Sequence, residues 1–177
     1  ITPGYYNKPE INATSFTDGW FHTGDAGKIE NGILYITDRI KDLFKTSNGK
    51  YIAPQQIENL LVTDKYIDQV AVIGDLRKFV TALIVPDYAA VKDYAEQMKI
   101  EYKDIEDLLN NPKITSLIEG RIANLQEGLA KYEQVKRFKL LPNPFTSDNG
   151  ELTLTLKLKR KVINEHYNKE IEYMYSY

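Results

Sequence analysis

Two short apolar runs rich in β-branched residues place the strongest constraint on the fold of this chain. They read "QVAVIGD" (69–75) and "FVTALIVPD" (79–87), and only "LRK" separates them. Val, Ile and Thr favour strands, and a connection this short joins strands that are neighbours in a sheet. The two runs therefore predict a pair of adjacent strands.

Helical patterns lie on both sides of these strands. Pro54 is tolerated at the first position of a helix, and Ile57, Leu60 and Leu61 then share one face. The other predicted helices are "AAVKDYAEQMK", "DIEDLLNN", an apolar stripe that begins at Ile114, and one final helix "KVINEHYNKEIEYMY".

Shorter β segments complete the pattern. The turn Glu30-Asn31-Gly32 between "GKI" and "ILYIT" predicts a hairpin, and "FKLLPNPF" predicts a short strand. The strictly alternating "LTLTLKLK" predicts an amphipathic strand with its leucines on one side. The order of elements predicts an α+β domain, in which a short β-hairpin segment precedes a small mixed sheet with flanking helices.

Composition excludes several classes of protein. With 42% apolar and 27% charged residues among 177, the chain is typical of soluble globular proteins. The net charge of -2 gives no general attraction to nucleic acid. The absence of cysteine excludes disulfides and thiolate sites, and it suits a reducing compartment. The opening "ITPGYYNKPE" has neither a starting Met nor a signal-peptide profile, so we expect a piece of a longer chain.

Asp25 and Arg39 each have a functional and an ordinary structural interpretation. Asp25 follows a glycine, and its carboxylate could accept two hydrogen bonds from a ribose diol or satisfy its own turn. Arg39 follows the strand "ILYIT" and could donate to ribose or phosphate oxygens, or form a surface ion pair. These residues by themselves leave both interpretations open.

Lys157 lies in the alternating segment, on the side opposite the leucines. It could be presented to an anion, or it could protect a sheet edge against aggregation. No aromatic residues interleave with the basic residues around it, which does not favour nucleic acid. His22 and His166 lack metal-ligand spacing, so we expect no metal site in this chain.

The order and spacing of the motifs resemble the adenylate-forming superfamily, which includes acyl-CoA synthetases, peptide-synthetase adenylation domains and luciferase. The motifs are "DGWFHTGD", "GILYITDRIKDLFKTSNGKYIAPQQIE" and the later "LTLTLKLKR". Lys41 in "DRIK" and the "LKLKR" ending look most like long-chain fatty acid–CoA ligases. The usual Ser-Gly-Lys of the superfamily reads Thr155-Leu156-Lys157 here. The resemblance implies that residues 1–40 are the tail of a large N-terminal domain and that 41–177 form a C-terminal lid domain.

The resemblance also carries over residue roles. It implies that Asp25 and Arg39 bind the ribose, that Lys45 lies near the nucleotide phosphate, and that Lys157 binds the substrate carboxylate and the α-phosphate. It further implies that Lys41 is a hinge, and that a loop with Gly49 and Tyr51 lines the pantetheine tunnel or touches the adenylate. "TSNGKY" does not match a phosphate-cradling loop, so we expect Gly49 to supply either a positive φ or a close approach of the backbone.

The activity that the resemblance implies belongs to the full-length enzyme. It would join a fatty acid to AMP from ATP, with Mg²⁺ travelling with the ATP, and would then transfer the acyl group to CoA. We expect the fragment alone to be inactive, its partner to be the N-terminal domain, and its location to be the cytoplasm, with room for peripheral contact at the inner membrane face. The alternatives are a luciferase-like or peptide-synthetase lid, or a non-catalytic interaction module that retains the lid fold.

Overall fold

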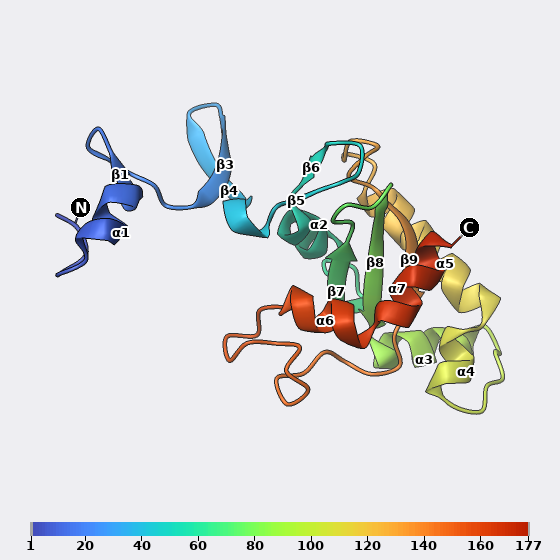
Figure 1. Ribbon diagram of the computed structural model, residues 1–177. Coiled ribbons are helices and arrows are strands. Elements are labelled where there is room, and N and C mark those ends of the chain that lie inside the picture. The colour runs from blue at the N-terminus through green and yellow to red at the C-terminus, as the bar shows by residue number, and fades with distance from the viewer. Residues whose placement is uncertain (1, 177) are drawn as a thin grey trace. The chain divides into compact units, whose positions relative to one another are not determined.

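The computed structural model describes residues 2–176, which fall into two compact units (Figure 1). The first unit is Ile1–Leu43 and the second is Phe44–Tyr177. Within the described residues, no helix combines the length and the apolar character needed to cross a membrane.

The first unit contains the hairpin that the Asn-Gly turn predicts. β3 (Asp25–Glu30) pairs antiparallel with β4 (Ile33–Arg39). Asn31 and Gly32 connect them with φ values of 52° and 78°, which suit an Asn-Gly turn between two strands. The predicted hairpin is therefore confirmed. The other elements of this unit are α1 (Pro9–Ser15), β1 (Phe16–Thr17), β2 (Trp20–Phe21) and the 3-10 helix η1 (Ile40–Asp42).

The second unit is built on a three-stranded mixed sheet (Figure 1). β7 (Ile67–Ile73) runs antiparallel to β8 (Val80–Pro86), and β8 runs parallel to β9 (Val135–Leu140). The predicted strand pair and the α+β class are both confirmed. The remaining elements are the strands β5 (Phe44–Lys45) and β6 (Tyr51–Ile52) and the helices α2 (Pro54–Leu61), α3 (Tyr88–Gln97), α4 (Ile105–Leu109), α5 (Pro112–Leu125), α6 (Arg160–His166) and α7 (Asn168–Tyr175).

Strand β8 is the centre of the core. All seven of its residues are buried, because apolar side chains cover both faces of the sheet. Ala82 and Ile84 belong to the apolar cluster that includes residues of α2, α3 and α5. Leu83 and Val85 point to the opposite face and belong to the cluster that includes residues of α6 and α7. The sheet therefore separates two cores.

The final helix is divided, which corrects the prediction of a single helix. α6 ends before Tyr167, whose φ and ψ are -105° and 26°, and α7 begins directly after it. The Tyr167 ring packs edge-on against Phe145, with ring centroids 5.8 Å apart. The apolar side chains of both helices nevertheless stay in the core, because Ile163, Ile171 and Met174 are all buried. The break therefore changes the direction of the chain without exposing its apolar residues.

The alternating segment "LTLTLKLK" is not a strand, and the prediction of one is wrong. Only an isolated bridge joins Leu152 to Leu158, and Leu156 has a φ of 58°. Leu154 is 98% exposed, so the leucines do not share a buried face. The physical reason is local: Thr153 forms side-chain and backbone hydrogen bonds with Lys157, and these fold the segment back on itself.

A buried ion pair joins α2 to α6 across the edge of the sheet. Arg160 donates from both terminal nitrogens to Glu58, at 2.7 and 2.8 Å. The same carboxylate accepts the backbone N–H of Val72 in β7 at 2.8 Å. Glu58 is buried between Ile57 and Leu61 on the inner side of α2. Three elements from distant parts of the sequence therefore meet at one carboxylate.

We predict that Glu58→Ala destabilises the 177-residue chain by about 3 kcal/mol, because it leaves the Arg160 guanidinium and the Val72 N–H without this acceptor. Alanine costs no helix propensity, so the loss reports on the contacts alone. Urea unfolding followed by circular dichroism measures it. Glu172→Ala, which breaks the exposed pair with Arg77, is the matched control and should cost far less. Equal unfolding midpoints for Glu58→Ala and the unchanged chain would contradict the prediction.

Candidate functional site

The hairpin of the first unit brings Asp25 and Arg39 together. They are directly opposed in the β3–β4 register, and the Arg39 Nε donates to Asp25 Oδ1 at 2.8 Å. Gly24 has a φ of 74°, and the Thr23 hydroxyl accepts the Asp25 N–H. The surface ion pair considered for Arg39 is therefore present. A carboxylate beside a guanidinium still offers acceptor and donor atoms next to one another, as binding of a diol requires.

A second hairpin brings together three other predicted residues. Lys45 in β5 is opposite Tyr51 in β6, and the Lys45 ammonium lies 5.5 Å from the centre of the Tyr51 ring. Gly49 closes the turn with a φ of 78°, so of the two expected alternatives the positive φ is present. Its N–H donates to the Thr46 carbonyl at 2.9 Å. The predicted phosphate lysine and the predicted acceptor loop therefore share one exposed hairpin.

Hydrogen bonds join this hairpin to the turn between β7 and β8. Ser47 donates its N–H to the Arg77 carbonyl, and Leu76 donates its N–H to the Lys45 carbonyl, both at 2.9 Å. A Cβ atom at Gly74 would lie 2.7 Å from the Phe44 ring, so this position needs glycine for the ring to pack closely. The loop is therefore attached to the central sheet.

Lys41, the predicted hinge, is exposed in the short helix η1. Extended residues flank this helix, with ψ values of 134° at Arg39 and 137° at Leu43. The boundary between the two compact units follows directly after Leu43.

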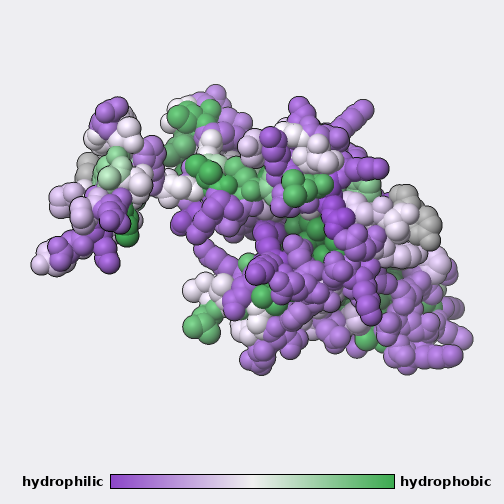
Figure 2. Space-filling view, in the orientation of Figure 1, coloured by the Kyte–Doolittle hydropathy of each residue, from purple (hydrophilic) through white to green (hydrophobic). Residues whose placement is uncertain are grey.

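Lys157 lies near the tip of an exposed loop between β9 and α6. Thr153 and Leu156 form a turn in which the Leu156 N–H donates to the Thr153 carbonyl at 2.9 Å. Lys157 follows this turn and is itself exposed. Figure 2 shows apolar atoms at the outer end of the loop, which agrees with the exposure of Leu154 and Leu156.

A buried carboxylate holds the base of this loop. Glu151 is 2% exposed, and its side chain accepts the Thr146 N–H at 3.0 Å and lies 3.1 Å from His166 Nδ1. Its backbone carbonyl accepts the Lys159 N–H at 2.7 Å. With the ion pair of the adjacent Arg160, these contacts fix the chain on both sides of the exposed turn that carries Lys157.

The predicted residues thus form separate groups. The loop between β9 and α6, which contains Lys157, and the β5–β6 hairpin lie apart in the second unit, with the hairpin near the top of the view and the loop at the lower left (Figure 1). Within residues 2–176, no group of three or more His, Asp or Glu side chains could hold a metal ion.

The sequence interpretation missed the residues that support the Lys157 loop. Glu58 carried a usable signal, because it is a charged residue within an otherwise apolar helix face. Glu151 carried none, since it follows a turn in which an acidic residue is unremarkable. Arg160 lies among the basic residues that follow Lys157 in the sequence, and its guanidinium is half-buried and paired with Glu58.

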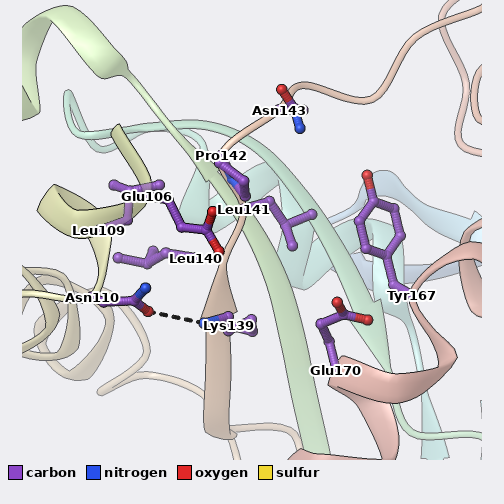
Figure 3. Close-up of a pocket in the computed structure, with 10 residues that line it drawn as sticks. All are labelled: Glu106, Leu109, Asn110, Lys139, Leu140, Leu141, Pro142, Asn143, Tyr167 and Glu170. Carbon is purple, nitrogen blue, oxygen red and sulfur yellow. Dashed lines mark hydrogen bonds between the residues drawn. The ribbon is translucent and has the colours of Figure 1, made fainter. Parts of the chain in front are cut away.

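A pocket lies between α4, β9 and α7 of the second unit (Figure 3). Leu109, Leu140 and Leu141 provide its apolar wall, and Lys139 donates to Asn110 at 3.1 Å on its rim. None of the residues predicted for the site lines it. Tyr167 also lines this pocket, and burial, aided by the nearby Glu151 carboxylate, raises its pKa to about 12.

Comparisons with known proteins add to this geometry. The family model of the AMP-binding enzyme C-terminal domain matches residues 41–177. A long-chain-fatty-acid–CoA ligase of Mycobacterium tuberculosis is 36% identical over 178 residues, which are 99% of this chain and 30% of that protein. Long-chain-fatty-acid–CoA ligase 1 of Homo sapiens is 38% identical over 181 residues, which are 99% of this chain and 26% of that protein.

Solved structures are similar in fold over the same length. The adenylation domain of a carboxylate reductase from Mycobacterium chelonae has a TM-score of 0.73 and 28% identity, and the match covers 99% of this chain and 26% of that one. The corresponding domain from Segniliparus rugosus, in complex with AMP and a carboxylic acid, has a TM-score of 0.73 and 27% identity, with 99% and 26% covered. The chain thus spans less than a third of the length of these relatives.

We predict that the free energy of unfolding falls between pH 10 and about 12, in part because of Tyr167. Its neutral form is favoured in the folded state, where its pKa is about 12, whereas an unfolded tyrosine ionises near pH 10. The contribution is complete below pH 10 and is lost as the pH rises through 12. Urea unfolding at several pH values should show a smaller fall for Tyr167→Phe than for the unchanged chain.

Tyr88→Phe serves as the companion variant, because burial also raises the pKa of Tyr88 to about 12. It should reduce the fall in a similar way. Identical pH slopes in both variants and the unchanged chain would contradict the prediction.

Proposed function

Because the chain belongs to the AMP-binding enzyme C-terminal domain family, we propose that it is the C-terminal part of a long-chain fatty acid–CoA ligase. The full-length enzyme would join a fatty acid to AMP from ATP with release of pyrophosphate. It would then transfer the acyl group to the thiol of CoA. Residues 1–40 would be the tail of the N-terminal domain, and 41–177 the lid domain.

The position of Lys157 carries this proposal. Its ammonium is exposed near the tip of a loop whose base is fixed by Glu151 and Arg160. A cation on an ordered backbone can stabilise the charge that develops where a carboxylate attacks the α-phosphate, at little cost of reorganisation. We assign Lys157 to this adenylation step.

Asp25 and Arg39 would hold the ribose of the nucleotide. Their mutual hydrogen bond keeps the carboxylate and the guanidinium side by side, so that one can accept from the ribose hydroxyls while the other donates. Lys45 would lie near the nucleotide phosphates. Mg²⁺ would arrive with ATP as part of the substrate.

The hairpin with Gly49 and Tyr51 would serve the second half-reaction. In the full-length enzyme the lid domain would rotate about Lys41, first presenting Lys157 to the site and then this hairpin. Lys41 suits a pivot because it is exposed in a single short helical turn between extended residues. Two half-reactions would then use one site in succession.

The proposal requires a large partner domain, and the first unit has a surface suited to one. Ile29, Leu34 and Ile36 of the β3–β4 hairpin are all exposed. Apolar side chains gathered in this way mark a surface for protein contact. We propose that the N-terminal part of the enzyme covers them.

We also propose that the enzyme is cytoplasmic, with peripheral contact at the inner membrane face. The membrane contact is expected because the long alkyl chain of its substrate partitions into bilayers.

The similarity to carboxylate reductase adenylation domains favours one second candidate. The full-length protein could activate a carboxylate and pass it to an acceptor other than CoA. Incubation with ATP, Mg²⁺ and palmitate, with and without CoA, separates the candidates. Acyl-CoA formation supports the ligase, whereas acyl-adenylate that CoA does not consume supports the second candidate. The 177-residue chain alone should form neither product.

We predict that Lys157→Ala in the full-length enzyme lowers the rate of adenylation by about a hundredfold, in line with the loss of one charge-stabilising contact. Pyrophosphate release measures this step. Thioester formation from preformed acyl-adenylate should be nearly unchanged, because Lys157 would then be away from the site. Equal losses in both half-reactions would exclude the role assigned to Lys157.

We predict that Lys41→Pro blocks thioester formation while adenylation survives. Proline fixes φ near -65°, whereas a pivot must adopt two backbone conformations. Lys41→Ala keeps this freedom and is the matched control, with a mild effect on both half-reactions. Near-normal acyl-CoA production by Lys41→Pro would place the rotation axis elsewhere.

A further inference from the structure

We propose that Thr153 is a positioning residue that holds Lys157 for the adenylation step, an inference that rests on the function proposed above for Lys157. The two residues lie opposite each other at the neck of the exposed turn. Both backbone polar groups of Lys157 bond to this one threonine. The Lys157 N–H donates to the Thr153 hydroxyl oxygen at 3.0 Å, and the Lys157 carbonyl accepts the Thr153 N–H at 2.8 Å.

The Thr153 hydroxyl accepts the Lys157 N–H, and the backbone atoms of Thr153 are already engaged in other hydrogen bonds. The Thr153 N–H is already used by the Lys157 carbonyl, and the Thr153 carbonyl accepts both the Leu156 N–H at 2.9 Å and the Ser147 hydroxyl at 3.3 Å. The remaining acceptor for the Lys157 N–H is the side-chain oxygen. The Thr155 hydroxyl lies 3.1 Å from that oxygen and can exchange a hydrogen bond with it. The threonine therefore closes the turn with three separate groups.

The turn needs this closure because its backbone is not relaxed. Leu156, directly before Lys157, has a φ of 58°, which branched or bulky residues rarely adopt. Leu156 is also 73% exposed, so packing does not compensate for this conformation. The hydrogen bonds of Thr153 are the contacts that oppose relaxation of the turn toward other conformations.

The closure connects Lys157 to the buried part of the loop. Directly below Thr153, Leu152 and Leu158 form a bridge, and the Lys159 N–H bonds to the Glu151 carbonyl at 2.7 Å. A continuous series of contacts thus runs from the buried Glu151 to Lys157. Removal of the Thr153 hydroxyl takes away the bond to the Lys157 N–H, whereas the backbone bond to the Lys157 carbonyl and the base of the loop remain.

The test is Thr153→Val in the full-length enzyme, which replaces the hydroxyl by a methyl group and keeps the branched shape. We expect the maximal rate of adenylation to fall about tenfold, since small displacements of a catalytic group cost up to about a hundredfold. The KM for ATP should change less than this rate. Thioester formation from preformed acyl-adenylate should be unchanged.

Two variants separate positioning from general loss of structure. Thr153→Ser retains the hydroxyl and should restore adenylation to within about twofold of the unchanged enzyme. Thr155→Val makes the same chemical change two residues away, where the hydroxyl accepts no bond from Lys157, and should have a clearly smaller effect.

The double variant Thr153→Val with Lys157→Ala decides whether Thr153 acts through Lys157. If it does, the double variant should be no slower than Lys157→Ala alone. Additive losses would overturn the proposal, as would full adenylation activity in Thr153→Val. If Lys157→Ala itself left adenylation unchanged, the proposed function of Lys157 would fail, and that outcome is distinct from a failure of Thr153→Val alone.

Discussion

The arrangement of the second unit depends on the buried carboxylate of Glu58. It accepts two hydrogen bonds from Arg160 and one from the Val72 backbone, and it thereby fixes the start of α6 against α2 and the edge strand β7. A buried charge is costly unless it is paired, so this contact specifies one docking position for α6. Since the Lys157 loop ends at Arg160, its C-terminal end is fixed by the same contact. Glu151 performs the equivalent task at the other end of the loop, with Thr146 and His166 as its partners.

Two exposed segments project from the second unit, and hydrogen bonds hold each of them at its base. The β5–β6 hairpin bonds to the turn that carries Leu76 and Arg77, whereas the Lys157 loop bonds to Glu151 and to the start of α6. They lie apart in the second unit (Figure 1). An enzyme that performs two half-reactions at one site could present first one segment and then the other by rotation of the whole domain, with no change inside the domain.

Much of the fold could be predicted because its signals are local. The Asn31-Gly32 turn, Pro54 at a helix start, and the β-branched strand pair each depend on residues adjacent in sequence. The alternating leucines misled because alternation predicts a strand only where a sheet edge is available, and here the Thr153 hydroxyl supplies a local alternative. Glu58 could be recognised as anomalous, but its partner is 102 residues away, beyond any local pattern. The candidate site residues came from motif resemblance, since Asp25, Arg39 and Lys157 each have an ordinary structural interpretation.

The role proposed for Lys157 depends on its presentation on an ordered backbone whose base is buried. Amide hydrogen exchange in the 177-residue chain tests it most directly, because the N–H groups of Lys157 and Lys159 are bonded to Thr153 and Glu151. Both amides should exchange at least about tenfold more slowly than in an unstructured peptide, with Lys159 the slower of the two. Exchange of both amides at the rate of an unstructured peptide would contradict the account.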